Sequence, residues 1–572
     1  MNLTPDQPIA GILAPLFALR SENDLGIGDV QSLREFVDWA SEVGFRLIQL
    51  LPINETGNDN SPYNAISSAA IEPATLVVSP EAIPDLSLGD FKEIMEKVDR
   101  SKLSAGPVNY PAVKALKRSL LEKAFARFAK SHLGRNTFRA AQFLAFVRKE
   151  ASWIEGYALF RALIDENGGS ERWDSWPEPQ RGLKEARAWL AEQKHTQRKA
   201  FERRMRFFMY IQWLAFSQWK ALHAYCNEKN VALMGDVPYG ISLYSADVFC
   251  ERDLFDLQWG GGAPPEPYFK DDLFTQKWGQ NWGVPVYRWD VMRRNKFAWW
   301  RRRVRMAREI FNLFRVDHIL GFYRIYSFPW RPELNPVFLP LSADEARGRT
   351  GGLLPHFLPR DDSTGENREA NRRAGEEYLK ALLEETGEHR LIGEDLGMVP
   401  DYVRPNLTAL GIAGFKIPTW ETESDGSLVA GGKYQRLSVA TYGTHDHEPI
   451  RVLWTRWDKL ARSGGAESGS ALREMQKLAA FAGLEGALPQ PWSDTMHEKL
   501  LRALFACNSW LAICMITDLF ATEQRFNVPG AVSQSNWSER LPRTVAGFKA
   551  DRKISSKMKV VRQMLTECRR VP

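Results

Sequence analysis

Cysteine is scarce in this chain, and its few cysteines form no pattern. Five of the 572 residues are cysteine, they are widely scattered, and no CxxC pair occurs. This argues against a disulfide framework and a zinc site, and for a reducing compartment. The motifs HExxH and DxDxDG, which supply metal ligands, are absent as well. We therefore expect neither a metal ion nor a cofactor.

Long hydrophobic runs are also missing. No stretch approaches the roughly 18 consecutive apolar residues of a membrane span, and Gly11 and Pro15 interrupt the apolar segment near the N-terminus. We therefore expect a soluble, unexported, cytoplasmic protein with no membrane partner. The 76 Lys+Arg and 70 Asp+Glu residues give a net charge of only +6, which does not indicate a nucleic-acid partner.

The chain begins with a β–α–β rhythm. Residues 11–17 and 46–52 are apolar runs typical of buried strands. Between them, apolar residues recur at helical spacing over 30–43, with Asp29 as the expected N-cap and Gly44 as the stop. This alternation predicts a parallel sheet, either wound open or closed as a barrel.

A long interruption of this rhythm divides the chain. Residues 1–54 start the predicted barrel, 55–230 form a mainly helical insertion that walls a cleft, and 231–572 complete the barrel. Long loops are expected at the carboxyl face of the sheet. One is a lid loop at 256–290, rich in Gly, Pro and aromatic residues, and the other is a polar insertion at 330–373.

Acidic residues end most of the later strands. All but one of the six later candidate strands end in a carboxylate, and the strands themselves are 231–238, 310–317, 390–395, 411–420, 437–446 and 510–518. The predicted fold is thus an α/β TIM (β/α)8 barrel with large helical insertions after strand 2. Because parallel strands of a barrel end on one face, we expect four of these acids to converge there, namely Asp236, Asp317, Glu394 and Asp446.

The residues around Asp317 indicate the chemistry. Arg315 lies two positions earlier and so shares one side of an extended segment with Asp317. A guanidinium favours the ionised form of a carboxylate, which a nucleophile requires, although a structural ion pair gives the same pattern. Clustered carboxylates with Arg315 and His445 suit glycosidic-bond chemistry. A cation site of clustered acids and a transition-metal site at His445 and His447 are less favoured, because no dense ligand motif accompanies them.

Four short motifs occur in a fixed order along the chain, namely Gly235-Asp-Val-Pro, Phe314-Arg-Val-Asp-His, Gly393-Glu-Asp-Leu-Gly and Thr444-His-Asp. Further segments extend the pattern over nearly the whole chain, at 59–63, 153–160, 173–177, 262–265, 280–283, 525–530 and 536–537. No single motif is decisive, but the ordered set resembles the α-amylase superfamily. Within it, the sequence is similar to the 4-α-glucanotransferases of glycoside hydrolase family 77, the amylomaltases or disproportionating enzymes.

The resemblance implies a retaining double displacement on α-1,4-glucans, which moves a segment from a donor maltodextrin to glucose or another maltodextrin. Asp317 would be the nucleophile, Glu394 the general acid and base, and Asp446 the group that stabilises the transition state. The substrate-binding residues implied in the same way are Arg315, His445, Asp236, Tyr63, Ser61, Trp282, Trp420 and Asn536.

Two features depart from the family pattern. His447 stands where the family usually has Asn, and the insertion at 330–373 replaces a shorter Gly-Trp-containing loop. Both departures bear on acceptor preference. The alternatives are a hydrolase on the same barrel and a glucan-binding protein without catalysis, although binding alone does not require a nucleophile paired with an acid.

Overall fold

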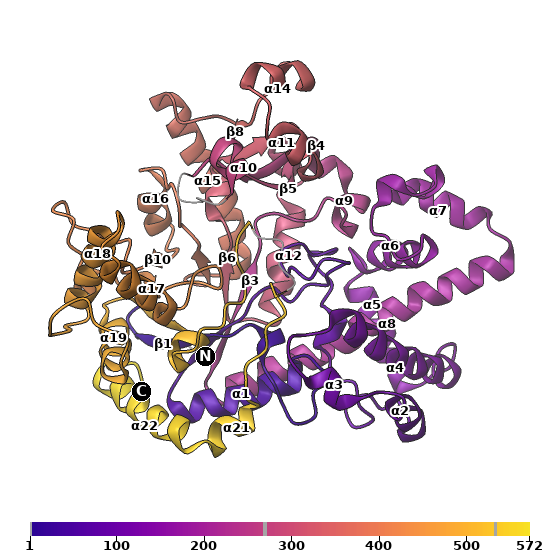
Figure 1. Cartoon of the computed structure of the whole chain (residues 1–572). Coiled ribbons are helices and arrows are strands. Elements are labelled where there is room, and N and C mark those ends of the chain that lie inside the picture. The colour runs from indigo at the N-terminus through magenta and orange to yellow at the C-terminus, as the bar shows by residue number, and fades with distance from the viewer. Residues whose placement is uncertain (1–2, 267–271, 531–534, 572) are drawn as a thin grey trace.

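The computed structural model describes residues 3–266, 272–530 and 535–571. Eight parallel strands form the central sheet, in the order β10-β11-β12-β1-β2-β3-β6-β9. The backbone N–H of Gly393 in β9 donates to Ala413 O, just before β10, at 2.8 Å and closes the sheet. The predicted (β/α)8 barrel is confirmed (Figure 1). Its strands are β1 (Ile9–Leu13), β2 (Leu47–Gln49), β3 (Ala232–Val237), β6 (Leu313–Val316), β9 (Leu391–Gly393), β10 (Gly414–Lys416), β11 (Ser438–Ala440) and β12 (Leu511–Met515).

Helix α1 (Val30–Val43) shows how local sequence sets the first β–α–β unit. The carboxylate of Asp29 accepts hydrogen bonds from the N–H groups of Gln31 and Ser32, which caps the helix. At the other end Gly44 adopts a φ of 107°, a conformation that favours glycine. Both expected helix boundaries are confirmed.

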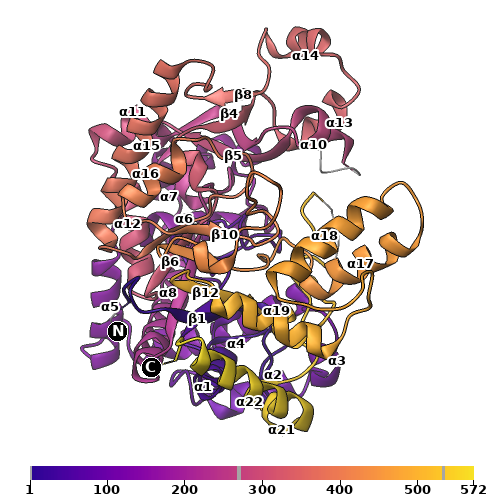
Figure 2. The ribbon, with the colours of Figure 1, turned by 90° about the vertical axis from the view of Figure 1, so that its left-hand side faces the viewer.

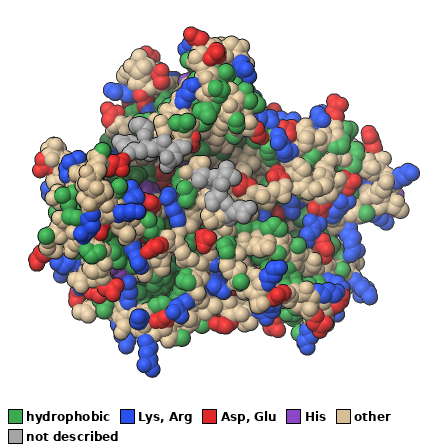
Figure 3. Space-filling model, in the orientation of Figure 1, with side chains coloured by type: hydrophobic (Ala, Val, Ile, Leu, Met, Phe, Trp, Pro, Cys, Tyr) green, Lys and Arg blue, Asp and Glu red, His purple; other side chains and the backbone are tan. Residues whose placement is uncertain are grey.

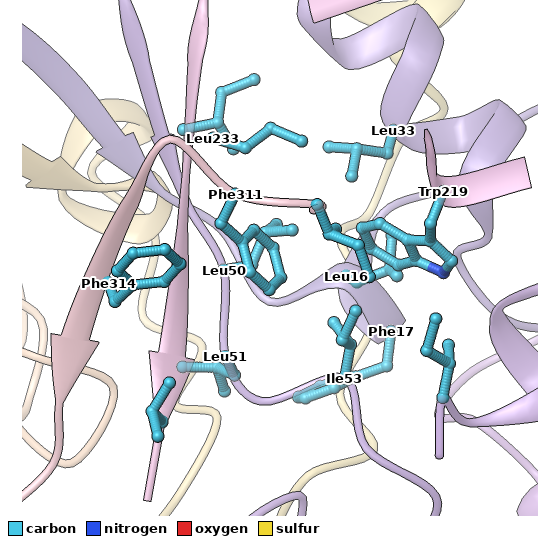
Figure 4. Packing of buried hydrophobic residues seen from close by; sticks show 14 of the residues in the cluster. Leu16, Phe17, Leu33, Leu50, Leu51, Ile53, Trp219, Leu233, Phe311 and Phe314 are labelled. Carbon is cyan, nitrogen blue, oxygen red and sulfur yellow. The ribbon is translucent and has the colours of Figure 1, made fainter. Parts of the chain in front are cut away.

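The core lies inside the barrel and between the barrel and its helices. Figure 4 shows Leu233 and Phe314 of the strands beside Phe311, Leu33 and Trp219. A Cβ at Gly235 would lie 2.3 Å from the Phe311 ring, so β3 passes this ring only because residue 235 is glycine. Close packing therefore fixes the level at which β3 delivers Asp236 to the carboxyl face.

Helices fill most of the segment between β2 and β3. The stretch 185–228, which reads as one helix in the sequence, forms two helices that are separated at Gln193 and Lys194. The helices of this segment are α2 (Leu88–Met95), α3 (Arg100–Ser104), α4 (Tyr110–Ser131), α5 (Phe138–Lys149), α6 (Ile154–Glu166), α7 (Leu183–Glu192) and α8 (His195–Glu228). They lie on the right-hand side of Figure 1.

A second, antiparallel sheet replaces much of the expected loop structure. Its order is β5-β4-β7-β8, with strands β4 (Phe255–Ala263), β5 (Gln280–Tyr287), β7 (Ile325–Phe328) and β8 (His356–Leu358). The prediction of a loop at 256–290 is therefore wrong for its described part, and residues 267–271 lie outside that part. The prediction of an irregular 330–373 is also wrong, because α13 (Asn335–Phe338), α14 (Ala343–Thr350), β8 and the start of α15 (Gly365–Thr386) occupy it.

The remaining helices surround the barrel. They are α9 (Ala246–Cys250), α10 (Leu273–Trp278), α11 (Trp289–Arg294), α12 (Ala298–Arg308), α16 (Val403–Ala409), α17 (Ile450–Arg462), α18 (Ser468–Phe481), α19 (Asp494–Ala506), α20 (Ile516–Phe520), α21 (Val545–Ala550) and α22 (Arg552–Glu567). Figure 2 shows α13 and α14 at the top of the molecule and α17 and α18 at its right-hand side. Within the described ranges, no helix combines the length and the apolar character that crossing a membrane requires.

Charged side chains of both signs are mixed over the surface seen in Figure 3. The spacing of apolar residues in α12 predicts that its arginines form a solvated face. Arg305 and Arg308 are exposed, and Arg301 and Arg305 pair with Glu385. Arg303 does not match this prediction. This side chain is buried, with its guanidinium over the rings of Trp299 and Trp300.

Candidate active site

Arg315 joins two carboxylates at the carboxyl end of the barrel. Its Nη1 lies 2.7 Å from Asp236 Oδ2 and 2.9 Å from Asp317 Oδ1. Asp236 belongs to β3 and Arg315 to the neighbouring β6, where the two residues are register partners. Asp317 follows β6 directly and its side chain is 28% exposed, whereas those of Arg315 and Asp236 are buried. The one carboxylate of this group that a substrate can reach is therefore Asp317.

Glu394 follows the next strand of the barrel, β9. Its Oε2 accepts the backbone N–H of His318 at 2.9 Å, and its Oε1 accepts that of Leu396 at 3.1 Å. Burial, with the nearby negative charge of Asp317 adding to it, raises the pKa of Glu394 to about 8, although Arg315 and the His318 N–H act in the opposite direction. A carboxyl group with such a pKa holds its proton at neutral pH.

Asp446 lies beyond β11, in the loop that leads to α17. Asn527 Nδ2 donates to its Oδ1 at 2.6 Å, and His445 Nε2 lies 3.3 Å from its Oδ2. Burial opposes ionisation, but His445, Asn527 and Arg315 together lower the pKa of Asp446. The guanidinium of Arg525 also donates to Asp446 O at 2.7 Å. The carboxylate is therefore fixed in its charged form.

Tyr63 connects the helical segment to the barrel face. Its hydroxyl donates to Asp236 Oδ2 at 2.7 Å, and its ring stacks on His445 at 5.1 Å between centroids. The Trp537 ring packs against both of these rings. Ser61 Oγ accepts the backbone N–H of Tyr63 at 3.3 Å and so holds the turn that presents this side chain.

Two exposed tryptophan rings each contact a histidine ring. Trp282 is 40% exposed, and its ring meets that of His318 edge-on at 4.9 Å. Trp420 is 52% exposed, and its ring lies 5.2 Å from that of His447. Burial lowers the pKa of His447 to about 4, so this ring is neutral at neutral pH. Thr444 N–H donates to His447 Nδ1 at 3.1 Å, which assigns the remaining proton to Nε2.

Sequence comparison identifies the kind of protein that carries this site. A family model described as 4-alpha-glucanotransferase matches residues 14–545. The chain belongs to the 4-α-glucanotransferase family. This confirms the resemblance that the ordered motifs indicate.

Named relatives extend over almost the whole chain. The 4-α-glucanotransferase of Chlamydia pneumoniae is 31% identical over 551 residues, which cover 94% of this chain and 92% of the relative. That of Thermus thermophilus is 28% identical over 537 residues, 90% of this chain and 91% of the relative. Among solved structures, the amylomaltase of Streptococcus agalactiae in complex with acarbose has a TM-score of 0.70 at 20% identity, with 99% of this chain and 100% of that chain covered.

A second solved structure agrees on the fold. The amylomaltase of Corynebacterium glutamicum has a TM-score of 0.74 at 20% identity, with 97% of this chain and 75% of that chain covered. The barrel of this 4-α-glucanotransferase family member is therefore shared with both amylomaltases.

Most residues expected in the site of this 4-α-glucanotransferase are linked by direct contacts. Arg315, Asp236 and Tyr63 form one hydrogen-bonded set with Asp317, and the Tyr63–His445 stack links it to Asp446. Asp518, which ends the eighth predicted strand, lies instead in α20, where it accepts Ile450 N–H at 2.7 Å. Asn536 exchanges hydrogen bonds with the backbone of Val528, and these contacts fasten a loop.

The sequence alone assigned no role to four further residues of the site, namely His318, Arg525, Asn527 and Trp537. Three of them lie in the motifs 525–530 and 536–537, so the sequence indicated that these segments matter without indicating what each residue does. His318 adopts a left-handed conformation with φ of 45°, which directs its N–H to Glu394 and its ring to Trp282. Local sequence does not reveal such a conformation at a histidine.

Proposed function

We propose that this chain transfers α-1,4-glucan segments between maltodextrins by a retaining double displacement. Asp317 is the nucleophile, Glu394 the general acid and base, and Asp446 the stabiliser of positive charge at the anomeric carbon. The observation that carries the proposal is the contrast between two neighbouring carboxyl groups. The pKa of Glu394 is raised to about 8, whereas the Asp317 carboxylate is paired with the guanidinium of Arg315. Such a division gives one site both an acid and a nucleophile.

In the first step, a carboxylate oxygen of Asp317 attacks the anomeric carbon of the donor. The glycosidic C–O bond breaks, and the leaving oxygen takes the proton of Glu394, which becomes a carboxylate. The product is a β-glucosyl ester on Asp317 and a shortened donor. The negative charge of Asp446, which Asn527 and His445 hold in place, favours an oxocarbenium-like transition state.

In the second step, the 4-hydroxyl of an acceptor glucose or maltodextrin replaces the leaving group. Glu394 takes the hydroxyl proton, the acceptor oxygen attacks the anomeric carbon, and the ester bond to Asp317 breaks. The two inversions together retain the α configuration. Both carboxyl groups return to their initial protonation states, so the cycle needs no metal and no cofactor.

Sugar binding follows from the groups around these acids. Tyr63 is half-buried and offers its hydroxyl next to Asp317, and Ser61 positions it. The buried Asp236, Arg315 and His445 contribute to sugar binding by holding Tyr63, Asp317 and Asp446 in place. Trp282 and Trp420 expose flat faces on which a sugar ring can stack. We assign Trp282 to the lid formed by β4 and β5, and Asn536 to fastening the loop that carries Trp537.

Transfer requires that an acceptor hydroxyl reach the ester before water does. The antiparallel sheet reaches His318, the residue next to Asp317, through the ring of Trp282, and this contact supports a role in excluding water. All five cysteines are free thiols, which supports our placing of this reaction in the cytoplasm.

Incubation with maltotriose tests the proposal. We expect glucose and a ladder of longer maltodextrins, with a constant number of reducing ends, and we expect Asp317→Asn to form none of these products. A rise in reducing ends with only shorter products would favour the hydrolase. Absence of turnover together with maltodextrin binding would favour a binding protein.

A further inference from the structure

A cavity of about 340 Å³ lies outside the site described above. The β4–β5 sheet supplies one side of its lining, including Trp259 and Gly283. Leu243, in the segment after β3, and the stretch 329–350 supply the rest. In the upper part of Figure 3, hydrophobic side chains gather below α14. None of the three acids assigned to catalysis lines this cavity.

The apolar part of the lining is aromatic and flat. Trp259 is half-buried and meets His356 edge-on at 4.8 Å between ring centroids. Trp330 is stacked on Phe338 with centroids 3.9 Å apart and an interplanar angle of 2°. Trp330 and Phe338 are buried and form a rigid base of the cavity, whereas the half-buried ring of Trp259 offers a face on which the C–H face of a pyranose can stack.

The polar part of the lining offers groups for hydroxyl recognition. Arg331 is held by Asp174 at 2.7 Å and by the Tyr244 hydroxyl at 3.1 Å. Within the described ranges, the side chains of Gln258 and Arg349 make no hydrogen bond or ion pair, although both line the cavity. A guanidinium and an amide that are free to bond suit neutral, hydroxyl-rich ligands. A purely apolar ligand would leave them unused.

The cavity adjoins the active centre through β5. Gly283 lines the cavity, and the residue before it, Trp282, contacts His318 beside Glu394. A Cβ at Gly283 would lie 2.6 Å from Pro332, so the sheet and the stretch 329–350 approach closely because residue 283 is glycine. This approach gives the cavity a rigid wall next to the reacting site.

We propose that this cavity is a second α-glucan-binding site, which anchors long maltodextrin chains while the active centre acts on their ends. The inference rests on the proposed function for the identity of the sugar. Anchoring raises the local concentration of chain ends at Asp317. Its effect is therefore confined to substrates longer than the active centre holds, and maltotriose gains nothing from it.

The experiment measures binding and turnover in the full chain. Binding to glycogen is followed by gel retardation in an Asp317→Asn background, so that no turnover occurs. We expect Trp259→Ala and Arg349→Ala each to weaken glycogen binding roughly tenfold, a typical loss for a main contact. In the otherwise native chain, the same changes raise KM for amylose and leave kcat/KM for maltotriose within about twofold.

Matched variants separate recognition from damage to the sheet. Arg347 lies on the same helix, α14, but pairs with Asp344 at 2.8 Å and does not line the cavity, so Arg347→Ala should bind glycogen normally. Trp259→Phe keeps a flat ring and should keep most of the binding. Unchanged retardation in both alanine variants overturns the inference. So does a loss confined to Trp259→Ala, which would indicate a disturbed β4.

The proposed function and this inference fail in different ways. If the native chain does not elongate maltotriose, the proposed transfer is wrong, while glycogen retardation still reports on the cavity. If maltotriose is elongated but glycogen is not retarded, only the second site is wrong.

Discussion

The Nη1 atom of Arg315 lies 2.9 Å from Asp317 Oδ1. The same nitrogen also bonds both carboxylate oxygens of Asp236, at 2.9 and 2.7 Å. One guanidinium therefore fixes the proposed nucleophile and neutralises a buried acid. The side chain of Asp236 is fully buried. A shift of Arg315 relative to Asp317 would therefore also disturb its contact with this buried carboxylate.

Arg315→Ala should damage both activity and stability. Removing the guanidinium leaves Asp236 as an unpaired buried charge, which typically costs about 3–5 kcal/mol in the free energy of unfolding. It also releases Asp317, and we expect kcat/KM to fall by at least about 100-fold. Denaturant titration and initial rates on maltotriose measure the two effects.

Asp317→Asn is the matched control for this prediction. Its side chain is 28% exposed, so we expect loss of turnover with little change in the free energy of unfolding, about 1 kcal/mol or less. Equal destabilisation by both changes would contradict the shared role of Arg315.

The pH profile should reflect Glu394. Burial raises the pKa of Glu394 to about 8, and the first step requires the protonated form. We therefore expect kcat/KM to fall as the pH rises through about 8. Initial rates on maltotriose across the range test this. A profile without a basic limb up to about pH 9 would argue against Glu394 as the acid.

Asn527 should matter although it carries no charge. Its amide donates to Asp446 Oδ1 at 2.6 Å and helps to lower the pKa of Asp446. We expect Asn527→Ala to reduce kcat by roughly 10- to 100-fold with a smaller change in KM, because the contact aligns a group that acts in the transition state. Asn527→Asp should be worse, since it places a like charge beside Asp446. A change in KM alone would show that Asn527 acts in binding.

His447 should influence the acceptor. Its ring supports Trp420 at 5.2 Å, and an aromatic contact of this kind is worth about 0.5–1.5 kcal/mol. His447→Asn should loosen the Trp420 platform and lower the ratio of transfer to hydrolysis roughly two- to tenfold. Counting reducing ends against total products measures that ratio. His195→Asn, at the exposed start of α8, should leave it unchanged.

The part of this site that sequence could predict is the part encoded locally. Asp236, Asp317 and Glu394 each lie within a strand or directly after it, so strand patterns alone place them on one face. Asp446 is different, because β11 ends at Ala440 and the loop that follows carries the carboxylate. The strand pattern predicted a strand over 437–446 that ends at this acid, and that strand end was wrong. The loop nevertheless brings Asp446 to His445, whose ring stacks on Tyr63.

Contacts that join distant segments could not be predicted. Strand β4 pairs with β7, and it pairs with β5 with register shifts between Asp256 and Gly260 and between Gly261 and Gly262. Its Gly-rich sequence therefore resembles a loop although the partner strands make it a sheet. The same holds for Arg303, whose charge indicates a surface position until Trp299 and Trp300 are seen to cover it.

A buried acid outside the active centre should make stability depend on pH. Burial raises the pKa of Asp518 to about 7, although its Oδ1 accepts Ile450 N–H. Because the folded-state value exceeds the usual 3.8, the stability that this group contributes is complete below about pH 4 and is lost as the pH rises through about 7. The loss is at most about 4 kcal/mol.

Asp518→Asn removes this titration and retains an oxygen that accepts the Ile450 N–H. We therefore expect the variant to exceed the native chain in Tm at pH 8, and this advantage to shrink steadily as the pH is lowered to about 4. Thermal unfolding of both proteins at several pH values measures the difference. A Tm difference that is independent of pH would mean that Asp518 does not titrate in this range, and that the amide changes only local packing.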